Sequence, residues 1–138
     1  MFPLYIHRVI KPLKEMGCII KSNDGLLPLH IDASNSFKGI DYKMPIASAQ
    51  VKSAILLAGL GAKNPSVVKE LKHSRNHSEI MLESMGANIV VDDNNITVNP
   101  LSSKLKSFNM DIPADPSSAA FFIALAALLK GSDLTVKN

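Results

Sequence analysis

The chain has 138 residues, about the length of one domain, and 46% of them are hydrophobic while 20% are charged. Its longest apolar run, residues 119–129, is shorter than the roughly 18 residues that a membrane-spanning helix needs, so we expect no membrane partner. The formal net charge is +3, but the basic residues are scattered, tryptophan is absent and only 5% of residues are aromatic. This pattern lacks the basic stripe and the stacking platforms of nucleic-acid binding, so we expect no nucleic-acid partner.

The cysteine content and the N-terminal residues indicate the cellular compartment of the protein. The single cysteine, Cys18, excludes an internal disulfide and is typical of a reducing compartment. The first eight residues lack the basic region and apolar core of a signal peptide, so we expect a cytoplasmic protein. Because Cys18 stands next to Gly17 at the start of an apolar run, we expect its side chain to fill core space.

Hydrophobic periodicity predicts alternating helices and strands along the chain. In chain order, the expected helices are residues 7–16, 48–60, 78–85 and 116–129. The expected strands include residues 18–20, 26–31, 66–71, 88–91, 96–98 and 133–136. Polar turns separate two of the strand pairs, at 22–25 and at 92–95.

The order of these elements repeats. A Met-Gly pair ends one helical pattern at Gly17 and another at Gly86, and the two glycines are 69 residues apart. A proline precedes a helix at Pro45 and again 68 residues later at Pro113. A glycine follows a helix at Gly61 and again 70 residues later at Gly131. Three landmarks at nearly one spacing predict a repeated structural unit.

The predicted unit is strand, helix, strand, helix, strand, strand. One full copy occupies residues 36–100, the second half of a copy occupies 1–35, and only the first half of a copy follows. A helix such as 7–16 needs a sheet to cover its apolar side, and the missing half unit would supply it. Because the chain starts and stops inside a unit, we expect a piece of a longer protein.

The helix start at Ser48 is a candidate anion site. Ser48 is a favourable N-cap residue, and Pro45 keeps the chain before it extended. Several backbone N–H groups at 48–50 lack an intrahelical acceptor and stand at the positive end of the helix dipole, an arrangement that binds anions. The alternative is an ordinary capped core helix, which is favoured by an apolar stripe at i, i+3, i+4 and i+7: Val51, Ala54, Ile55 and Ala58.

Four segments carry a resemblance to a known enzyme family. They read MPIASAQVKSAILLAG at 44–59, RVIKPLKEMG at 8–17, SRNHSEIML with a following MGA at 74–87, and DIPADPSSAA at 111–120. In this order and at these spacings they resemble the enolpyruvylshikimate-phosphate synthases, also called 3-phosphoshikimate 1-carboxyvinyltransferases. The sequence is closer to the bacterial class that tolerates glyphosate than to the plant-like class.

The resemblance implies a fold and a reaction. The fold is α/β (α+β), an inside-out barrel of repeated βαβαββ units in two lobes that close on the substrates. Residues 1–110 would form the C-terminal part of the first lobe, and 111–138 the hinge and the start of the second. The family transfers the enolpyruvyl group of phosphoenolpyruvate to shikimate 3-phosphate on the way to chorismate and the aromatic amino acids. No cofactor and no metal are implied.

The same resemblance implies four substrate-binding residues. Ser48, Ala49 and Gln50 would hold shikimate 3-phosphate, with the phosphate against the Ser48 hydroxyl and the backbone N–H groups. Gln50 would reach toward the ring and the phosphoenolpyruvate side. Arg75 matches an arginine near the same substrate, and a guanidinium is a natural partner of phosphate. The alternatives are a plain helix cap for the first three and a solvated side chain for Arg75.

At two other helix starts the sequence predicts a capping role rather than a ligand-binding role. Asn76 with Glu79 three residues later predicts a capping box. Asp115 with Pro116 predicts an N-cap at the helix that follows the hinge. His73 and His77 are four residues apart, but Asn76 as N-cap leaves His73 outside the helix, so we do not expect them to bind a metal.

Several motifs of the family have no counterpart in this chain. These are the N-terminal Pro-Gly-Asp-Lys-Ser, the Gly-Asn-Ala-Gly-Thr segment and an Arg-Pro-Met where this chain has Leu4-Tyr5-Ile6. Enolpyruvyl transfer needs an acid for the vinyl carbon and a base for the acceptor hydroxyl, and we assign neither role to any residue here. We therefore expect a chain that is inactive alone, with the remainder of the enzyme as a partner.

Two alternatives remain open at this stage. The chain could be a non-catalytic remnant or an interaction module that keeps the fold without the chemistry. It could also derive from a cell-wall UDP-N-acetylglucosamine enolpyruvyl transferase, which shares the repeat architecture. For that second family we expect a different sequence at residues 48–50.

Overall fold

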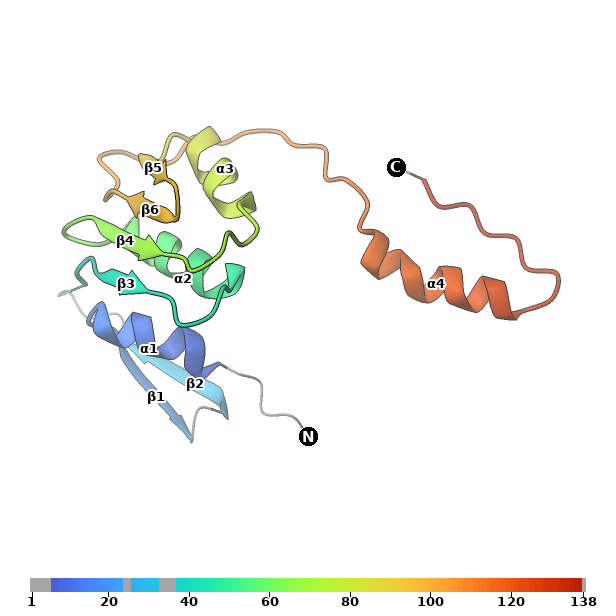
Figure 1. The fold of residues 1–138 in the computed structure, drawn as a ribbon, viewed down its shortest axis with the longest axis horizontal. Helices are drawn as coiled ribbons and strands as arrows, with labels where there is room; N and C mark the ends of the chain where they lie inside the picture. The colour runs from blue at the N-terminus through green and yellow to red at the C-terminus, as the bar shows by residue number, and fades with distance from the viewer. Residues whose placement is uncertain (1–5, 24–25, 33–36, 138) are drawn as a thin grey trace. The chain divides into compact units, whose positions relative to one another are not determined.

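The computed structural model describes residues 6–23, 26–32 and 37–137, in two compact units with the boundary between Ser107 and Phe108. Figure 1 shows the elements in chain order. The first unit contains α1 (His7–Glu15), β1 (Ile19–Asn23), β2 (Leu26–Asp32), β3 (Asp41–Lys43), α2 (Ala49–Gly59), β4 (Ser66–Lys69), α3 (His77–Ser84), β5 (Ile89–Asp92) and β6 (Asn95–Val98). The second contains α4 (Pro116–Leu128).

The full copy of the repeat forms a four-stranded sheet in the order β3-β4-β6-β5 (Figure 1). β3 and β4 are parallel and joined through α2, while β6 is antiparallel to both β4 and β5. Tyr42, Val68 and Ile96 are partners across β3, β4 and β6, and all three are buried. The predicted strand, helix, strand, helix, strand, strand order of residues 36–100 is confirmed.

α2 lies very close to this sheet. In the predicted apolar stripe Val51 and Ile55 are buried, whereas Ala54 and Ala58 are only partly buried. A Cβ atom added at Gly59 would lie 2.5 Å from Val98 Cγ1 and 3.2 Å from Ser66 Oγ, so a side chain at residue 59 would collide with the sheet. The absence of a side chain at Gly59 is what allows the close approach.

α1 packs against α2 on one side and on the β1–β2 hairpin on the other. In the antiparallel hairpin Ile20 is the partner of Ile31, and a small cluster of buried side chains fills the space beneath the helix: Ile10, Cys18 and Ile20. Cys18 fills core space as predicted, and burial, together with the charge of Asp32, raises the pKa of its thiol. Asp24 and Gly25 of the predicted polar turn lie outside the described residues.

The two Met-Gly landmarks have the same backbone conformation. Gly17 has φ +99° and follows α1; its amide donates to Lys14 O at 2.9 Å, and the amide of Cys18 donates to Leu13 O at 2.9 Å. This pair of bonds is a Schellman motif, which needs a left-handed residue and therefore favours glycine. The carbonyl of Met16 then accepts a hydrogen bond from the amide of Lys38 at 2.9 Å.

α3 ends in the same way. Gly86 has φ +90°, its amide donates to Glu83 O at 2.9 Å, and the amide of Ala87 donates to Leu82 O at 2.9 Å. Here too the preceding methionine carbonyl accepts from a lysine, because the amide of Lys106 donates to Met85 O at 2.8 Å. The spacing predicted from the sequence thus corresponds to a repeat in three dimensions.

The second unit differs from the prediction. α4 is present, but residues 133–136 are not a strand, and no strand precedes the helix within 99–115. The prediction of flanking strands is wrong because a strand needs a neighbour for its backbone hydrogen bonds, and α4 is the one regular element among the described residues of this unit. α4 itself buries no residue.

α4 is almost wholly apolar, and large side chains on it are open to solvent, including Phe121 and Leu128. Within the described stretches of the chain, no helix combines the length and the hydrophobicity that crossing a bilayer requires.

The left-handed glycine of the repeat can be tested by substitution. We expect Gly86→Ala to lower the free energy of unfolding by about 1–2 kcal/mol, because an L-residue is strained at this φ while the added Cβ meets no atom within 4 Å. Urea unfolding followed by circular dichroism measures the change. Gly61→Ala is the matched control, since its Cβ would lie 3.8 Å from Ala58 O without a left-handed backbone, and it should not destabilise. Equal losses in both variants would contradict the conformational explanation.

Candidate functional site

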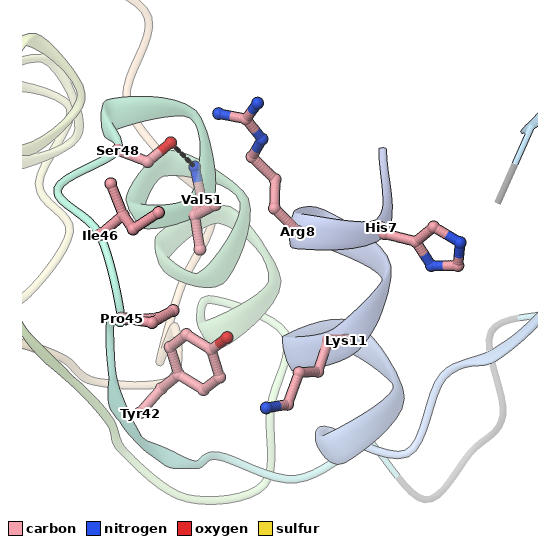
Figure 2. A pocket seen from close by; sticks show the side chains of 8 residues that line it. All are labelled: His7, Arg8, Lys11, Tyr42, Pro45, Ile46, Ser48 and Val51. Carbon is pink, nitrogen blue, oxygen red and sulfur yellow. Dashed lines mark hydrogen bonds between the residues drawn. The ribbon is translucent and has the colours of Figure 1, made fainter. Parts of the chain in front are cut away.

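A cavity of about 530 Å³ opens between α1 and the start of α2, within the size range of small-ligand pockets (Figure 2). Its lining comes from α1, from β3 and the segment after it, and from the first turn of α2. The lining residues are His7, Arg8, Lys11, Tyr42, Pro45, Ile46, Ser48 and Val51.

Two cationic side chains give the cavity its charge. Arg8 and Lys11 are three residues apart and therefore share one side of α1. Figure 2 shows both extending from α1 toward the segment that carries Tyr42 and Ser48, while the ring of His7 points away from that segment. Arg8 and Lys11 are not among the site residues predicted from the sequence, although both lie in the segment 8–17 that carries the resemblance.

The opposite wall is apolar apart from two hydroxyls. Pro45, Ile46 and the ring of Tyr42 line it together with Ser48. Burial, and to a smaller extent the negative charge of Glu15, raises the pKa of the Tyr42 hydroxyl, which therefore stays neutral at physiological pH. A cavity with cations on one side and neutral groups on the other suits an anion with an apolar or hydroxylated body.

Ser48 caps α2 as predicted. Its backbone is extended, with φ −151° and ψ +107°, and its Oγ accepts a hydrogen bond from the amide of Val51 at 3.4 Å. Ala49 and Gln50 occupy the first turn, where amides have no intrahelical acceptor. Ser48 lines the cavity, whereas Ala49 and Gln50 stand next to it, and the Gln50 side chain is exposed.

Arg75 does not share this cavity. It is exposed and lies in the segment between β4 and α3, just after Ser74. The structure therefore brings Ser48 together with Arg8 and Lys11, and it leaves Arg75 outside the cavity lining. Leu4 and Tyr5, at the place of the family's Arg-Pro-Met, lie outside the described residues.

A buried ion cluster lies behind the start of α2. Lys52 is 1% exposed, and its Nζ is 3.2 Å from Glu70 Oε2 and 2.6 Å from Glu79 Oε1. Glu70 and Glu79 are buried as well. The local sequence does not predict this cluster, because a lysine next to the apolar stripe of α2 is usually exposed to solvent.

The cluster also explains why the predicted capping box is wrong. Asn76 is the N-cap residue of α3, but it makes no side-chain capping hydrogen bond, and the carboxylate of Glu79 pairs with Lys52 instead of returning to the helix start. A buried ammonium needs an anionic partner far more than a solvated backbone amide does.

His73 and His77 are both exposed, and the described residues contain no group of three potential ligands that could hold a metal ion.

In the second unit, the N-cap predicted at Asp115 is confirmed. Its carboxylate accepts from the amide of Ser117 at 3.0 Å and from the Ser118 hydroxyl at 2.6 Å, and Pro116 begins α4. The hydrogen bond from Ser118, followed by that from Ser117, lowers the pKa of Asp115. Its role as a hinge remains a prediction.

Comparison with known proteins gives one consistent result. The family model described as EPSP synthase (3-phosphoshikimate 1-carboxyvinyltransferase) matches residues 6–138. A protein of Endomicrobium trichonymphae with the name 3-phosphoshikimate 1-carboxyvinyltransferase is 50% identical over 96% of this chain, and one of Thermodesulfovibrio yellowstonii with the same name is 47% identical over 95%. In both cases this chain spans 31% of the relative's length.

Solved structures agree on the fold. EPSP synthase from Acinetobacter baumannii superposes with a TM-score of 0.74 at 41% identity, covering 95% of this chain and 30% of that one. The enolpyruvyl transferase NikO from Streptomyces tendae superposes with a TM-score of 0.57 at 17% identity, covering 69% of this chain and 22% of that one. The second likeness shows the fold alone.

Removing the buried ammonium should destabilise the first unit strongly. We expect Lys52→Met to lower the free energy of unfolding by about 3–5 kcal/mol, because two carboxylates would be left buried without their cation. Chemical unfolding measures the change. Lys63→Met removes a lysine from an exposed position and should change stability by no more than about 0.5 kcal/mol. A small effect at Lys52 would show that the cluster is solvated in solution.

Proposed function

This chain belongs to the EPSP synthase family, and on that basis we propose that it forms part of the shikimate 3-phosphate site of a 3-phosphoshikimate 1-carboxyvinyltransferase. The whole enzyme transfers the enolpyruvyl group of phosphoenolpyruvate to shikimate 3-phosphate, in the biosynthesis of chorismate and the aromatic amino acids. One observation carries the proposal: the capped start of α2 opens into a cavity that also holds two cationic side chains, Arg8 and Lys11.

Each proposed contact has a physical basis. The Ser48 Oγ already accepts from the Val51 amide, so its own hydrogen is available to a phosphate oxygen. The amides of Ala49 and Gln50 are donors at the positive end of the α2 dipole. The exposed Gln50 side chain can reach the hydroxylated ring, and Arg75 supplies a guanidinium from the next segment of the chain.

Arg8 and Lys11 add two cationic contacts to those that the family resemblance implies. Both line the cavity with Ser48, and their charges would offset those of a phosphate and a carboxylate on one ligand. Because they come from α1 and Ser48 comes from α2, the substrate would lie across the contact between the two helices.

The affinity of this part alone should be low. The helix dipole contributes about 0.3–1 kcal/mol to phosphate binding, and each hydrogen bond to the charged group adds about 1.5–3 kcal/mol. A dissociation constant of about 1 mM already requires roughly −4.1 kcal/mol after the cost of association. We therefore propose that the isolated chain binds shikimate 3-phosphate with millimolar or weaker affinity.

The chemistry depends on the remainder of the enzyme. We assign no residue of this chain to the acid that protonates the vinyl carbon or to the base that accepts the hydroxyl proton. The chain spans 31% of the length of its relatives, and we propose that the other parts of the enzyme are its partner and bring those groups. We propose that the enzyme is cytoplasmic, since a free cysteine is typical of a reducing compartment.

Binding can be followed residue by residue. We expect a titration of the full chain with shikimate 3-phosphate, observed by nitrogen–proton correlation spectra, to shift the amides of Ser48, Ala49 and Gln50. Ser48→Ala should weaken binding about tenfold or more, because one hydrogen bond to the phosphate is lost. Ser48→Thr is the matched control, since it keeps both the cap and the hydroxyl. Shifts confined to other parts of the chain would contradict the proposed site.

Turnover gives the second test. We expect the purified chain to release no inorganic phosphate from phosphoenolpyruvate in the presence of shikimate 3-phosphate. A chimera in which residues 6–138 replace the matching part of the Thermodesulfovibrio yellowstonii relative should release phosphate. We further propose that this sequence is of the glyphosate-tolerant class, so the chimera should stay active at glyphosate concentrations that stop a plant-like enzyme. Turnover by the isolated chain, or an inactive but folded chimera, would contradict the proposal.

A further inference from the structure

The buried cluster of Lys52, Glu70 and Glu79 is connected to the proposed anion site through α2. Lys52 lies one turn after Ser48, and its amide donates to Ser48 O at 3.0 Å. Its ammonium is fixed between the two carboxylates, at 3.2 Å from Glu70 and 2.6 Å from Glu79. The first turn of α2 therefore cannot move along the sheet without moving a buried charge away from its partners.

Glu70 connects the same cluster to the Arg75 segment. Its Oε2 accepts from Lys52, while its Oε1 accepts from the amide of Ser74 at 3.3 Å and from the Ser74 hydroxyl. Its own backbone is held as well, because its amide donates to Asn94 O at 2.8 Å in the turn between β5 and β6. Ser74 is the residue directly before Arg75.

Glu79 has a narrower set of contacts. Its Oε1 pairs with Lys52, and its buried Oε2 has no hydrogen-bond partner among the described residues. Glu79 therefore balances charge, whereas Glu70 balances charge and also holds a segment of the chain. A buried ion pair gives little net stability compared with apolar residues of the same volume, so stability alone does not account for this arrangement.

We propose that Glu70 is a positioning residue, which through Ser74 holds Arg75 at a fixed place relative to the first turn of α2. The inference rests on the proposed function, because it assigns to Arg75 and to residues 48–50 one common phosphate ligand. Glu70 does not touch that ligand. It joins the two proposed binding elements, which the cavity lining does not bring together.

The experiment removes the connection and leaves the binding groups in place. Ser74→Ala deletes the hydroxyl that Glu70 accepts from. Ser78→Ala is the matched control, because Ser78 is another partly buried serine near the same helices, but its hydroxyl pairs with that of Ser53 and not with Glu70. Each substitution is made in the full chain and again in the Arg75→Gln background.

We expect Ser74→Ala to weaken shikimate 3-phosphate binding by about threefold to tenfold and Ser78→Ala to leave it within about twofold. In the Arg75→Gln background, Ser74→Ala should cause no further loss, because its effect passes through Arg75. A merely structural role predicts equal losses in both backgrounds, and that result would overturn the inference.

A second measurement needs no ligand. We expect the amide of residue 74, which donates to Glu70 Oε1 at 3.3 Å, to exchange its hydrogen several-fold faster in Ser74→Ala than in the original chain after correction for the intrinsic rate, with no such change in Ser78→Ala. Unchanged exchange at residue 74 would overturn the inference even if binding is seen. Should the original chain show no binding of shikimate 3-phosphate and the folded chimera no turnover, the proposed function fails, and the exchange rates alone then decide whether Glu70 holds this segment.

Discussion

The structure of the first unit depends on how closely α2 lies on the four-stranded sheet. At the C-terminal end of α2, Gly59 allows the helix to approach Val98 and Ser66. Near its N-terminal end, the Lys52 ammonium is fixed between two buried carboxylates. These two contacts restrain the helix at both ends. The position of Ser48, and with it the proposed phosphate site, follows from contacts that lie outside the cavity itself.

Much of this architecture could be predicted from the sequence, because the patterns that carried it are local. The Met-Gly pairs indicated helix ends, and Gly17 and Gly86 adopt the same left-handed conformation with the same hydrogen bonds. Ser48 and Asp115 were recognisable as N-caps, since a short polar side chain before a helical pattern has a strong local preference. The fold of the family agrees with the unit deduced from spacing.

The features that the sequence did not reveal depend on contacts between distant segments. Lys52 and Glu79 are far apart in sequence, so pairing them requires knowledge of how α2 and α3 pack. The local pattern alone predicts a capping box for Glu79. Arg8 and Lys11 became visible as cavity residues when α1 was placed beside α2. The strand predicted at 133–136 is absent for a related reason. A strand forms only beside a neighbouring strand, and the local sequence pattern does not show whether one is present.

The apolar surface of α4 is not covered by other residues of the second unit. Its 13 residues bury nothing, although they are nearly all apolar, and isolated helices of this length are marginal in water. The Asp115 cap favours the first turn, but it cannot hold the later turns that carry Phe121 and Leu128. Helicity in this segment should therefore depend on whether a surface covers its apolar side chains.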